Sequence, residues 1–309
     1  MVIECAVVVA ASALLCAALV SRRTSWMVTR HVRDGERIRR GMLGAYATVA
    51  VIGCAALCLG TTDHTWQLLA PWIVALVLGL LVGNLALISR ARIQAVAPAR
   101  PKRVLAIGAH PDDLELACGG TLARMVDMGH DVHSVVMSRG GVGGVSDVRV
   151  LEAHEGALRL GVGALHVHDF PDTNLALTSR EMTLAIERDI AMIDPDIILT
   201  HSSHDQHQDH AAVHQAVLRA ARKHHSIMCF ESPSVTPDFN PTVFFDVSDY
   251  IDIKQDAVLA HQDQIQGDKV YMGRERLQGM AVFRGGQVRR RRAEGFEVVR
   301  LLADEAGVF

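Results

Sequence analysis

Three runs of about twenty residues with almost no charge lie within the first ninety positions of this 309-residue chain. Residues 2–20 carry only Glu4, and residues 41–60 and 66–88 carry no charge at all. A helix of this length crosses the roughly 30 Å hydrocarbon core of a bilayer and satisfies its own backbone hydrogen bonds there. The sequence therefore predicts three transmembrane helices within a membrane module at residues 1–94. A cleaved signal peptide is the alternative for the first run, but the positive segment that precedes such a peptide's apolar stretch is missing.

The placement of arginine predicts how these helices are oriented. The first hundred residues hold ten arginines and four acidic residues, and seven of the arginines fall at positions 21–40. Further basic residues follow the third run at 90–103, whereas the connection at 61–65 offers only Asp63 and His64, which we interpret as part of a turn. Basic segments stay in the cytoplasm. We therefore expect a multi-pass protein of the cell membrane with its N-terminus outside and its C-terminal domain in the cytoplasm.

Charge and cysteine content limit the function of the remaining chain. Its net charge is negative, since 21 basic residues stand against 30 acidic ones, and the whole chain carries −3. This balance argues against nucleic acid as the main partner. The six cysteines show no CxxC spacing, so they read as buried thiols in a reducing compartment rather than as a disulfide framework. The sequence makes no prediction of oligomeric state.

A short linker at 95–101, with two prolines, separates the membrane module from a domain at 102–309. From residue 102 the pattern alternates between short apolar runs and segments with helical periodicity. This alternation predicts an α/β domain: a Rossmann-like, mainly parallel sheet with helices on both faces. We expect strands at 104–109, 132–137, 165–169, 196–200 and 227–230, and helices at 114–128, 148–160, 180–193 and 209–223.

The first predicted strand ends in a histidine and two acidic residues, His110, Asp112 and Asp113. Ligands bind open parallel sheets beyond the carboxyl ends of the strands, so these side chains stand where a site is expected. The spacing of His110 and Asp113 lets both reach one ion, while Asp112 is free to act on a water molecule. The alternative is that one of the acids caps the helix that follows. Capping explains one acid but not the histidine and the second acid.

A histidine-rich stretch follows the fourth predicted strand, with histidines at every third position from 201 to 210. The carboxyl ends of parallel strands meet at one edge of a sheet, so the two polar strand ends should lie close together. Two or three nitrogen and carboxylate ligands with an open position are typical of a catalytic zinc site. Not all of these histidines can be ligands, and we expect His201, His204 and His214 to lie in solvent-exposed segments.

Two motifs in this domain resemble those of the PIG-L/LmbE-like zinc-dependent de-N-acetylases. The sequence Ala-His-Pro-Asp-Asp at 109–113 resembles the family's AHPDD motif, and His-Gln-Asp-His at 207–210 resembles its HxDH motif. The resemblance covers residues 102–303. Further segments that fit the family pattern are the RxxE block at 149–152 with LGV at 160–162, the FPD segment at 170–172, and AExF at 293–296.

The resemblance implies a zinc ion held by His110, Asp113 and His210, with Fe²⁺ as the alternative metal. It also implies that Asp112 is the general base that takes a proton from the attacking water. The chemistry agrees, since amide hydrolysis needs a nucleophile at neutral pH, and zinc lowers the pKa of bound water to about 7.

Four further roles follow from the same resemblance. His207 would stabilise the oxyanion or protonate the leaving amine, and Asp209 would orient His207. Arg149 and Asp172 would contact the sugar. Substrate contacts are the weaker part of the resemblance, because the family's usual SQ after a late histidine reads Gln262-Asp263-Gln264 here, and the glycine-rich loop at 139–144 lacks the frequent GE. We interpret that loop as a mobile active-site loop.

The expected function is hydrolytic removal of the N-acetyl group from an N-acetylglucosamine-containing substrate. The membrane module favours a lipid-linked substrate, with membrane lipids as further partners. One alternative is the same chemistry on a soluble N-acetylglucosamine conjugate. The other is a non-catalytic membrane sensor that binds metal or sugar. Asp112 argues against the sensor, because a binding module has no need of a base beside its ligands.

Overall fold

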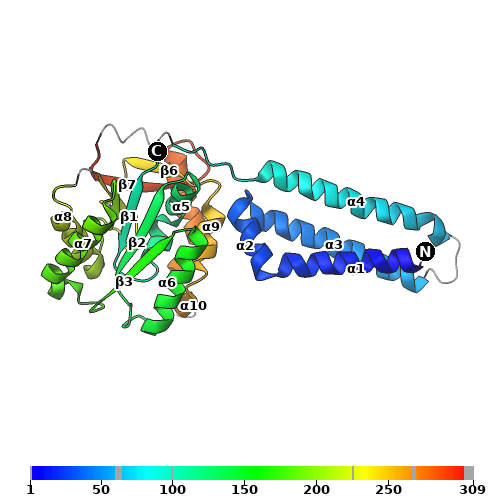
Figure 1. Ribbon diagram of the computed structural model, residues 1–309, viewed down its shortest axis with the longest axis horizontal. Helices are drawn as coiled ribbons and strands as arrows, with labels where there is room; N and C mark the ends of the chain where they lie inside the picture. The colour runs from blue at the N-terminus through cyan, green and yellow to red at the C-terminus, as the bar shows by residue number, and fades with distance from the viewer. Residues whose placement is uncertain (1, 60–64, 99, 225, 266–268, 303–309) are drawn as a thin grey trace. The chain divides into compact units, whose positions relative to one another are not determined.

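The computed structural model describes residues 2–59, 65–98, 100–224, 226–265 and 269–302 (Figure 1). The chain divides into two compact units, Met1–Gln94 and Ala95–Phe309. Most of the predicted connection at 61–65, with Asp63 and His64, lies outside the described residues.

The N-terminal unit consists of helices. Within its described residues, two helical segments are long and apolar enough to cross a membrane, Gly35–Cys58 and Pro71–Ala91. The first predicted span belongs to a pair of helices that bends by 69° near Ser21, and this pair would make a third crossing if it counts as one span. The four helices are α1 (Val2–Val20), α2 (Arg22–His31), α3 (Gly35–Leu59) and α4 (Thr65–Ala91).

Small and branched side chains pack the apolar helices of this unit together. Val8 of α1, Val49 of α3 and Val77 of α4 form a buried cluster. One polar contact accompanies this packing, in which the amide of Asn84 donates a hydrogen bond to the Tyr46 hydroxyl at 2.9 Å. Other large apolar side chains of the unit point outward, and Trp72 is 73 % exposed.

The C-terminal unit is built on a seven-stranded sheet with the strand order β3-β2-β1-β4-β5-β7-β6. The first five strands in the sequence pair in parallel, as the sequence predicts, while β7 runs antiparallel to both of its neighbours. The strands are β1 (Arg103–Gly108), β2 (Asp131–Ser138), β3 (Ala164–Phe170), β4 (Ile197–Thr200), β5 (Ile227–Phe230), β6 (Val243–Asp246) and β7 (Ala293–Arg300).

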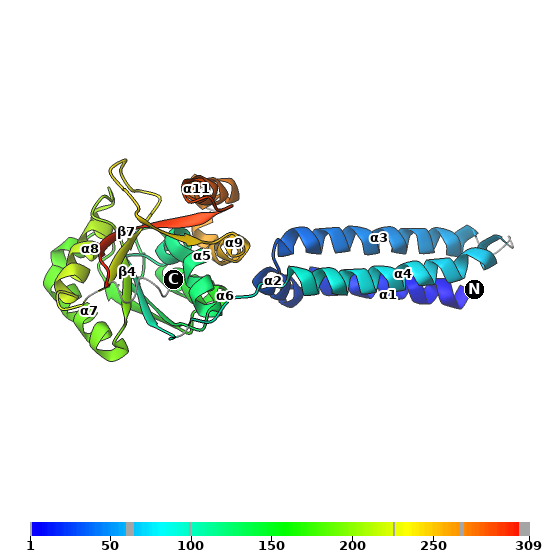
Figure 2. The ribbon, with the colours of Figure 1, turned by 90° about the horizontal axis from the view of Figure 1, so that it is seen from above.

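Helices cover both faces of this sheet (Figure 2). Helices α7 and α8 lie on one face, and α5, α6, α9 and α11 lie on the other. Parallel strands covered on both faces are apolar throughout rather than alternating, which explains why Val104–Ile107 of β1 are all fully buried. The helices are α5 (Asp113–Asp127), α6 (Ser146–Leu160), α7 (Ser179–Ile193), α8 (Gln208–Ala220), α9 (Ile251–Val258), α10 (Gln262–Ile265) and α11 (Arg274–Gln287), with short 3-10 turns at Leu175–Thr178 and Val270–Met272.

The main core fills the space between the sheet and the α7–α8 layer. Alternate residues of β1, Leu105 and Ile107, point into this layer and meet Met182 and Ile186 of α7 and Val213 of α8. All five side chains are fully buried. At about 25 cal/mol per Å² of apolar surface, each stabilises the fold by roughly 1.5–3 kcal/mol relative to an exposed side chain.

The order of the strands fixes where a site can form. Strands β1 and β4 are neighbours, and the order of the chain reverses between them, since β2 and β3 lie beyond β1 while β5 lies beyond β4. The segments that leave their carboxyl ends therefore diverge and leave a crevice between them. Residues 109–113 follow β1 and residues 201–210 follow β4, so the two polar motifs meet at this point.

Candidate active site

Asp113 is the first residue of α5, and its carboxylate turns back toward the end of β1. Its Oδ2 accepts hydrogen bonds from the backbone N–H groups of Ala109, at 2.9 Å, and His110, at 2.7 Å. Its Oδ1 faces His210 instead. Asp112 is the N-cap residue, but its side chain makes no capping hydrogen bond. Neither acid is therefore present merely to cap the helix. Helix capping, the alternative explanation of this motif, does not account for it.

His210 lies in the first turn of α8 and faces Asp113 across the crevice. Its Nε2 is 3.3 Å from Oδ1 of Asp113, and its Nδ1 is 2.9 Å from Oδ2 of Asp205. Asp205 is itself held by the hydroxyls of Ser232 and Ser234, which come from the segment after β5. One nitrogen of His210 is thus anchored by a carboxylate, and the other points at the predicted ligand Asp113.

His110 is arranged in the same way. Its Nδ1 is 3.5 Å from Oδ2 of Asp113. Its Nε2 is 3.1 Å from Oδ2 of Asp209 and 3.2 Å from Oδ1 of Asp172. Both predicted histidine ligands therefore have a carboxylate behind the nitrogen that faces away from Asp113. This pairing fixes the ring orientation of metal-binding histidines and raises their basicity.

Asp113 meets His210 through Oδ1 and His110 through Oδ2, at separations that ligand atoms around a zinc ion would show. Ligand atoms at 2.0–2.2 Å from a tetrahedral zinc lie about 3.3 Å from one another, which is close to the 3.3 Å and 3.5 Å that separate Asp113 from His210 and His110. Donor atoms of His110, His207 and His210 also lie within 4.8 Å of one another, as do those of Asp113, His201 and His210. Asp113 is thus adjacent to both predicted histidine ligands, while His207 and His201 complete the two sets whose donor atoms lie together. Nitrogen and carboxylate donors of this kind suit zinc or iron(II).

Electrostatic interactions hold the cluster in an ionised form. Burial disfavours the charged form of each group. At the histidines, however, the attraction of the neighbouring carboxylates outweighs this effect. Asp113 and Asp205 raise the pKa of His210 to about 9. Asp113, Asp172 and Asp209 raise the pKa of His110 well above its usual value. The cationic His210 in turn holds the pKa of Asp113 well below its usual range. The cluster therefore favours positive charge, which either protons on the histidines or a metal ion can supply.

Asp112 lies in the same pocket and forms a buried ion pair with Arg149 of α6. Nη2 of Arg149 is 3.1 Å from Oδ1 of Asp112. Nη1 of Arg149 donates a hydrogen bond to the carbonyl of Gly140 at 2.8 Å, which ties the glycine-rich loop to the pair. Both side chains are less than one-tenth exposed. Arg149, expected to contact the sugar, therefore also fixes the acid expected to be the base.

His207 is the N-cap residue of α8, and its ring is half-buried beside the other two histidines. Its Nδ1 accepts a hydrogen bond from the backbone N–H of Asp209 at 3.2 Å. Burial, with the charges on His210 and His110, lowers the pKa of His207. A neutral imidazole that accepts at Nδ1 carries its proton at Nε2. His207 is thus a hydrogen-bond donor to whatever occupies the pocket.

The position of Asp209 differs from the expectation that it orients His207. Its carboxylate contacts His110 and accepts hydrogen bonds from the backbone N–H groups of Thr173, at 2.7 Å, and Leu175, at 3.1 Å. Asp209 contacts the His207 ring through its backbone N–H instead. Asp209 thus links the predicted ligand His110 to the segment after β3.

Asp172 lies in the pocket, as expected for a residue that meets the substrate. Its Oδ2 accepts a hydrogen bond from the backbone N–H of Val142 at 2.7 Å, while its Oδ1 faces His110. The hydrogen bond from His110 and that from Val142 hold the pKa of Asp172 well below its usual value. Asp172 therefore remains ionised and connects the glycine-rich loop with the cluster.

The prediction of solvent-exposed histidines is wrong for His201 and His214. His201 is fully buried and stacks on His210, with ring centroids 3.9 Å apart. Burial lowers the pKa of His201 to about 4, so its ring is neutral. His214 is buried and contacts the carbonyl of His201 through Nδ1 at 2.8 Å. Only His204 behaves as expected, because its side chain is 44 % exposed.

Sequence reasoning missed the role of Asp205 and of the segment after β5. Asp205 stands five residues before His210 in the same polar stretch, so its proximity was available as a signal. Ser232 and Ser234 follow β5, the next parallel strand, and their place at the same sheet edge could have suggested them. Nothing local marks Tyr271, whose burial and the nearby charges of Asp112 and Asp113 raise its pKa.

These residues enclose a pocket of about 310 Å³. The cluster and the Asp112–Arg149 pair line it, together with Val142 and Gly143 of the glycine-rich loop. The other lining side chains are Leu116, Thr173, Pro233, Ser234, Lys269 and Tyr271.

Fold and pocket together define an α/β domain with a candidate metal site at the switch point of its sheet. The family model described as PIG-L, GlcNAc-PI de-N-acetylase, matches residues 105–221. The uncharacterized deacetylase YaiS of Escherichia coli is 36 % identical over 168 residues, 52 % of this chain and 91 % of that protein. The diacetylchitobiose deacetylase of Thermococcus kodakarensis is 31 % identical over 225 residues, 64 % of this chain and 83 % of that protein.

A solved structure agrees with these matches. The conserved protein TT1542 of Thermus thermophilus superposes with a TM-score of 0.58 at 28 % identity, over 65 % of this chain and 96 % of its own. The chain belongs to the PIG-L family of deacetylases. The family model begins at residue 105, after the apolar helices of the N-terminal unit.

Proposed function

We propose that this protein is a membrane-anchored, metal-dependent hydrolase that removes the N-acetyl group from an N-acetylglucosamine-containing, lipid-linked substrate. One observation carries the proposal. A buried carboxylate, Asp112, lies in the same pocket as the donor set of His110, Asp113 and His210, yet contributes to none of that set's contacts. A base held beside a metal site is the arrangement that hydrolysis of an amide requires.

The ion would be held by Nδ1 of His110, the carboxylate of Asp113 and Nε2 of His210. Zinc at this position would supply a Lewis acid that polarises the amide carbonyl and lowers the pKa of water to about 7. Asp205 and Asp209 would keep the two imidazoles oriented. Both carboxylates already occupy these positions, at 2.9 Å from His210 and 3.1 Å from His110.

Asp112 would take a proton from the attacking water. The Arg149 guanidinium holds this carboxylate on one side, at 3.1 Å, and leaves the rest of it toward the pocket. The pair is buried, so its geometry is maintained without competition from bulk solvent. Arg149 would act through Asp112, as a positioning residue, and could also reach a sugar hydroxyl in the pocket that both residues line.

His207 would donate a hydrogen bond from Nε2 to the carbonyl oxygen of the amide as negative charge develops there. Removing one donor of this kind costs roughly 10²–10³ in rate. The lowered pKa of His207 favours this role over protonation of the leaving amine, because the ring carries no extra proton at neutral pH. Asp172, which shares the pocket, would accept a hydrogen bond from a sugar hydroxyl.

The apolar helices of the N-terminal unit support a location at the membrane. Their outward-facing apolar side chains suit a lipid environment, and the arginines at 21–40 and 90–103 suit the cytoplasmic side. The proposed topology has the N-terminus outside and the catalytic domain in the cytoplasm. Protease added to intact spheroplasts should leave the domain uncut, and cleavage of the domain under these conditions would contradict the topology.

Reconstitution of the full chain into vesicles tests the substrate. A lipid-linked N-acetylglucosamine placed in the same vesicles as the protein should lose its acetyl group, whereas the same lipid in separate vesicles should not. Equal rates in the two arrangements would contradict action within the plane of the membrane. Release of free amine is the readout, and an Asp112→Asn protein is the control.

A second candidate is the same chemistry on a soluble N-acetylglucosamine conjugate, with the helices serving only for location. The relatives favour it, because one that is 31 % identical is named for diacetylchitobiose, a soluble disaccharide. Turnover of diacetylchitobiose at least as efficient as that of the lipid-linked substrate would favour this candidate over the first.

A further inference from the structure

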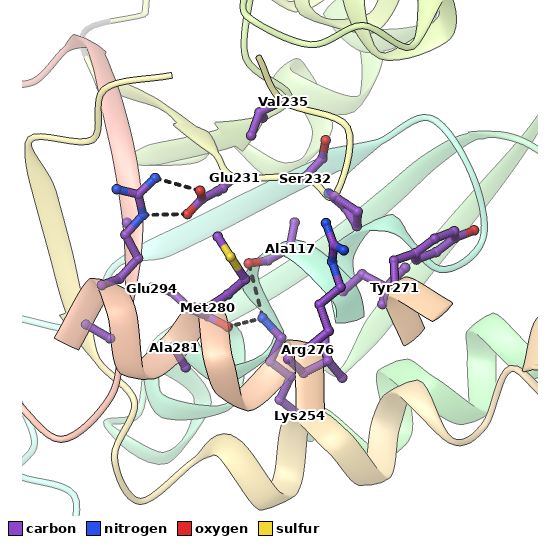
Figure 3. A pocket seen from close by; sticks show the side chains of 16 residues that line it. Ala117, Glu231, Ser232, Val235, Lys254, Tyr271, Arg276, Met280, Ala281 and Glu294 are labelled. Atoms are coloured by element: carbon purple, nitrogen blue, oxygen red, sulfur yellow. Dashed lines mark hydrogen bonds and ion pairs between the residues drawn. The ribbon is translucent and has the colours of Figure 1, made fainter. Parts of the chain in front are cut away.

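A second pocket, of about 220 Å³, opens beside the candidate active site. It is formed by α5, α11, the start of β7 and the segment after β5 (Figure 3). Leu116, Pro233 and Tyr271 line both pockets. The two pockets are therefore adjacent and share three lining side chains.

Most charges that line this second pocket are already paired. Arg284 and Glu231 form a two-pronged ion pair with distances of 2.6 and 2.8 Å. Nζ of Lys254 is 2.6 Å from Oε1 of Glu294 and also donates to the backbone carbonyl of Ala117. Figure 3 shows both ion pairs as dashed lines. These four side chains are close to neutral as pairs and offer little net charge to a ligand.

Arg276 differs from them. Its side chain extends from α11 into the pocket, and Figure 3 shows no interaction at its guanidinium. Across the described part of the chain, that guanidinium has no hydrogen bond or ion pair with another residue, whereas Arg274, two positions earlier on the same helix, is paired with Asp252 at 3.2 Å. Arg276 is exposed, and it leaves the rim of the pocket with one positive charge that no neighbouring acid among the described residues compensates.

The remaining lining is apolar. Leu277 and Ala281 of α11 are buried on this side, and Val235 lies across from them. Met280 is 40 % exposed although it lines the pocket. Methionine and an arginine at the edge of an apolar recess suit a ligand that combines an anionic group with a hydrocarbon portion.

The chemistry of the substrate indicates what would lie there. In N-acetylglucosamine the amide is attached at C2, next to the anomeric carbon C1 that bears the aglycone. When the amide is placed at the cluster, the group on C1 is only a few bonds away and extends out of the first pocket. The side chains of Leu116, Pro233 and Tyr271 border both that pocket and the space that holds the guanidinium of Arg276.

We infer that this second pocket binds the aglycone of the substrate, with an anionic group such as a phosphodiester contacting Arg276 and an apolar chain contacting Leu277 and Met280. The inference rests on the proposed deacetylation of an N-acetylglucosamine conjugate and specifies its substrate class. Phosphodiesters occur both in membrane lipids and in soluble conjugates, and the chemistry that Arg276 recognises is the same in both.

Two soluble conjugates that differ by one phosphate group test this inference on the full-length protein. One is butyl N-acetylglucosaminide, which is neutral, and the other is N-acetylglucosaminyl butyl phosphate, which is anionic. A charge-assisted hydrogen bond to an arginine corresponds to about a tenfold effect on binding. The wild-type protein should therefore show a KM about tenfold lower for the anionic conjugate.

Arg276→Gln should reduce this KM ratio to about one, and Arg276→Lys should keep part of it. The matched control is Arg274→Gln, which removes an arginine from the same helix outside the pocket and should keep the full ratio. Equal KM values for the two conjugates in the wild type, or a ratio that survives Arg276→Gln, would overturn the inference while leaving the proposed deacetylation intact.

Binding without turnover separates this inference from the proposed function. Butyl phosphate is titrated into chelator-treated protein, so that no metal can bind the probe. It should bind about tenfold more weakly to Arg276→Gln than to Arg274→Gln, whether or not either conjugate is deacetylated. Inorganic phosphate should bind more weakly than butyl phosphate, and Met280→Gln should remove that difference. Equal binding of the two anions to the wild type would show that the apolar part of the inference is wrong.

Discussion

Arg149 and Asp112 form a buried ion pair in which Nη2 of the guanidinium lies 3.1 Å from Oδ1 of the carboxylate. The two residues come from α6 and from the turn after β1, 37 positions apart in the chain. The same arginine donates to the carbonyl of Gly140. One side chain thus connects the proposed base, the glycine-rich loop and the wall of the pocket.

Arg149→Gln should lower kcat by about a hundredfold, because a base displaced by as little as 1 Å loses roughly that much rate. The metal content should stay unchanged, since Arg149 contacts none of the three proposed ligands. Arg149→Lys should recover part of the rate by restoring the charge. Measurement of acetate release and of bound metal on the same samples checks this, and a loss of metal in Arg149→Gln would show that the residue holds the cluster instead.

Gly140→Ala should act on the same ion pair from the loop side. Gly140 has a φ of +68°, a conformation that residues with a side chain rarely adopt. An added Cβ would lie 2.5 Å from Cζ of Arg149, so the guanidinium would have to move. We expect a loss of roughly 1–2 kcal/mol in stability and a fall in kcat similar to that of Arg149→Gln. Gly163→Ala is the matched control, because its Cβ would meet nothing within 4 Å.

Asp205→Asn should weaken metal binding by about 10–100-fold, the usual cost of losing a carboxylate behind a histidine ligand. The amide can still accept from Ser234, so the fold should be preserved. Competition with a chromophoric chelator gives the dissociation constant. Asp169→Asn, at a carboxylate that is 86 % exposed, is the control. An unchanged metal affinity in Asp205→Asn would show that Asp205 does not support metal binding.

Metal affinity should increase with pH up to about pH 9. Asp113 and Asp205 raise the pKa of His210 to about 9, against the effect of burial, so the ring is protonated at neutral pH when no metal is bound. Its Nε2 must lose that proton to become a ligand. The apparent affinity should therefore rise by at least about tenfold for each pH unit between 6 and 8. Zinc titrations at pH 6, 7 and 8 test this, and an affinity independent of pH would contradict the assignment of His210.

Local sequence patterns predicted the first half of the α/β domain well. Apolar runs mark β1 to β5 because strands covered on both faces must be apolar, and Gly161 ends α6 in the left-handed conformation that glycine favours. The meeting of the two polar motifs could be predicted because parallel strands place their carboxyl ends at one edge, whereas the choice of His210 as a ligand came from the resemblance to the family's motif. His110 and His210 are 100 positions apart, yet both follow neighbouring strands of the sheet.

The parts that escaped prediction depend on contacts between distant segments. Strands β6 and β7 pair antiparallel through distant residues, such as Phe244 and Gly295, which are 51 positions apart, and no local pattern specifies such a partner. The pairing of Asp209 with His110 and the burial of His201 likewise follow from how α8 packs against β1, rather than from motif spacing. Arg276 carries no sequence signal at all, because its importance lies in the lack of a partner among the residues around it.

The central claim is that a metal held by His110, Asp113 and His210 acts together with Asp112 to hydrolyse an N-acetyl group. Acetate release from N-acetylglucosaminyl butyl phosphate, measured alongside bound zinc for the wild type, His210→Ala and Asp112→Asn, tests it most directly. We predict about one zinc per chain and acetate release in the wild type, neither in His210→Ala, and zinc with at least a hundredfold slower release in Asp112→Asn. Full activity in Asp112→Asn, or zinc retained at full occupancy in His210→Ala, would contradict the account.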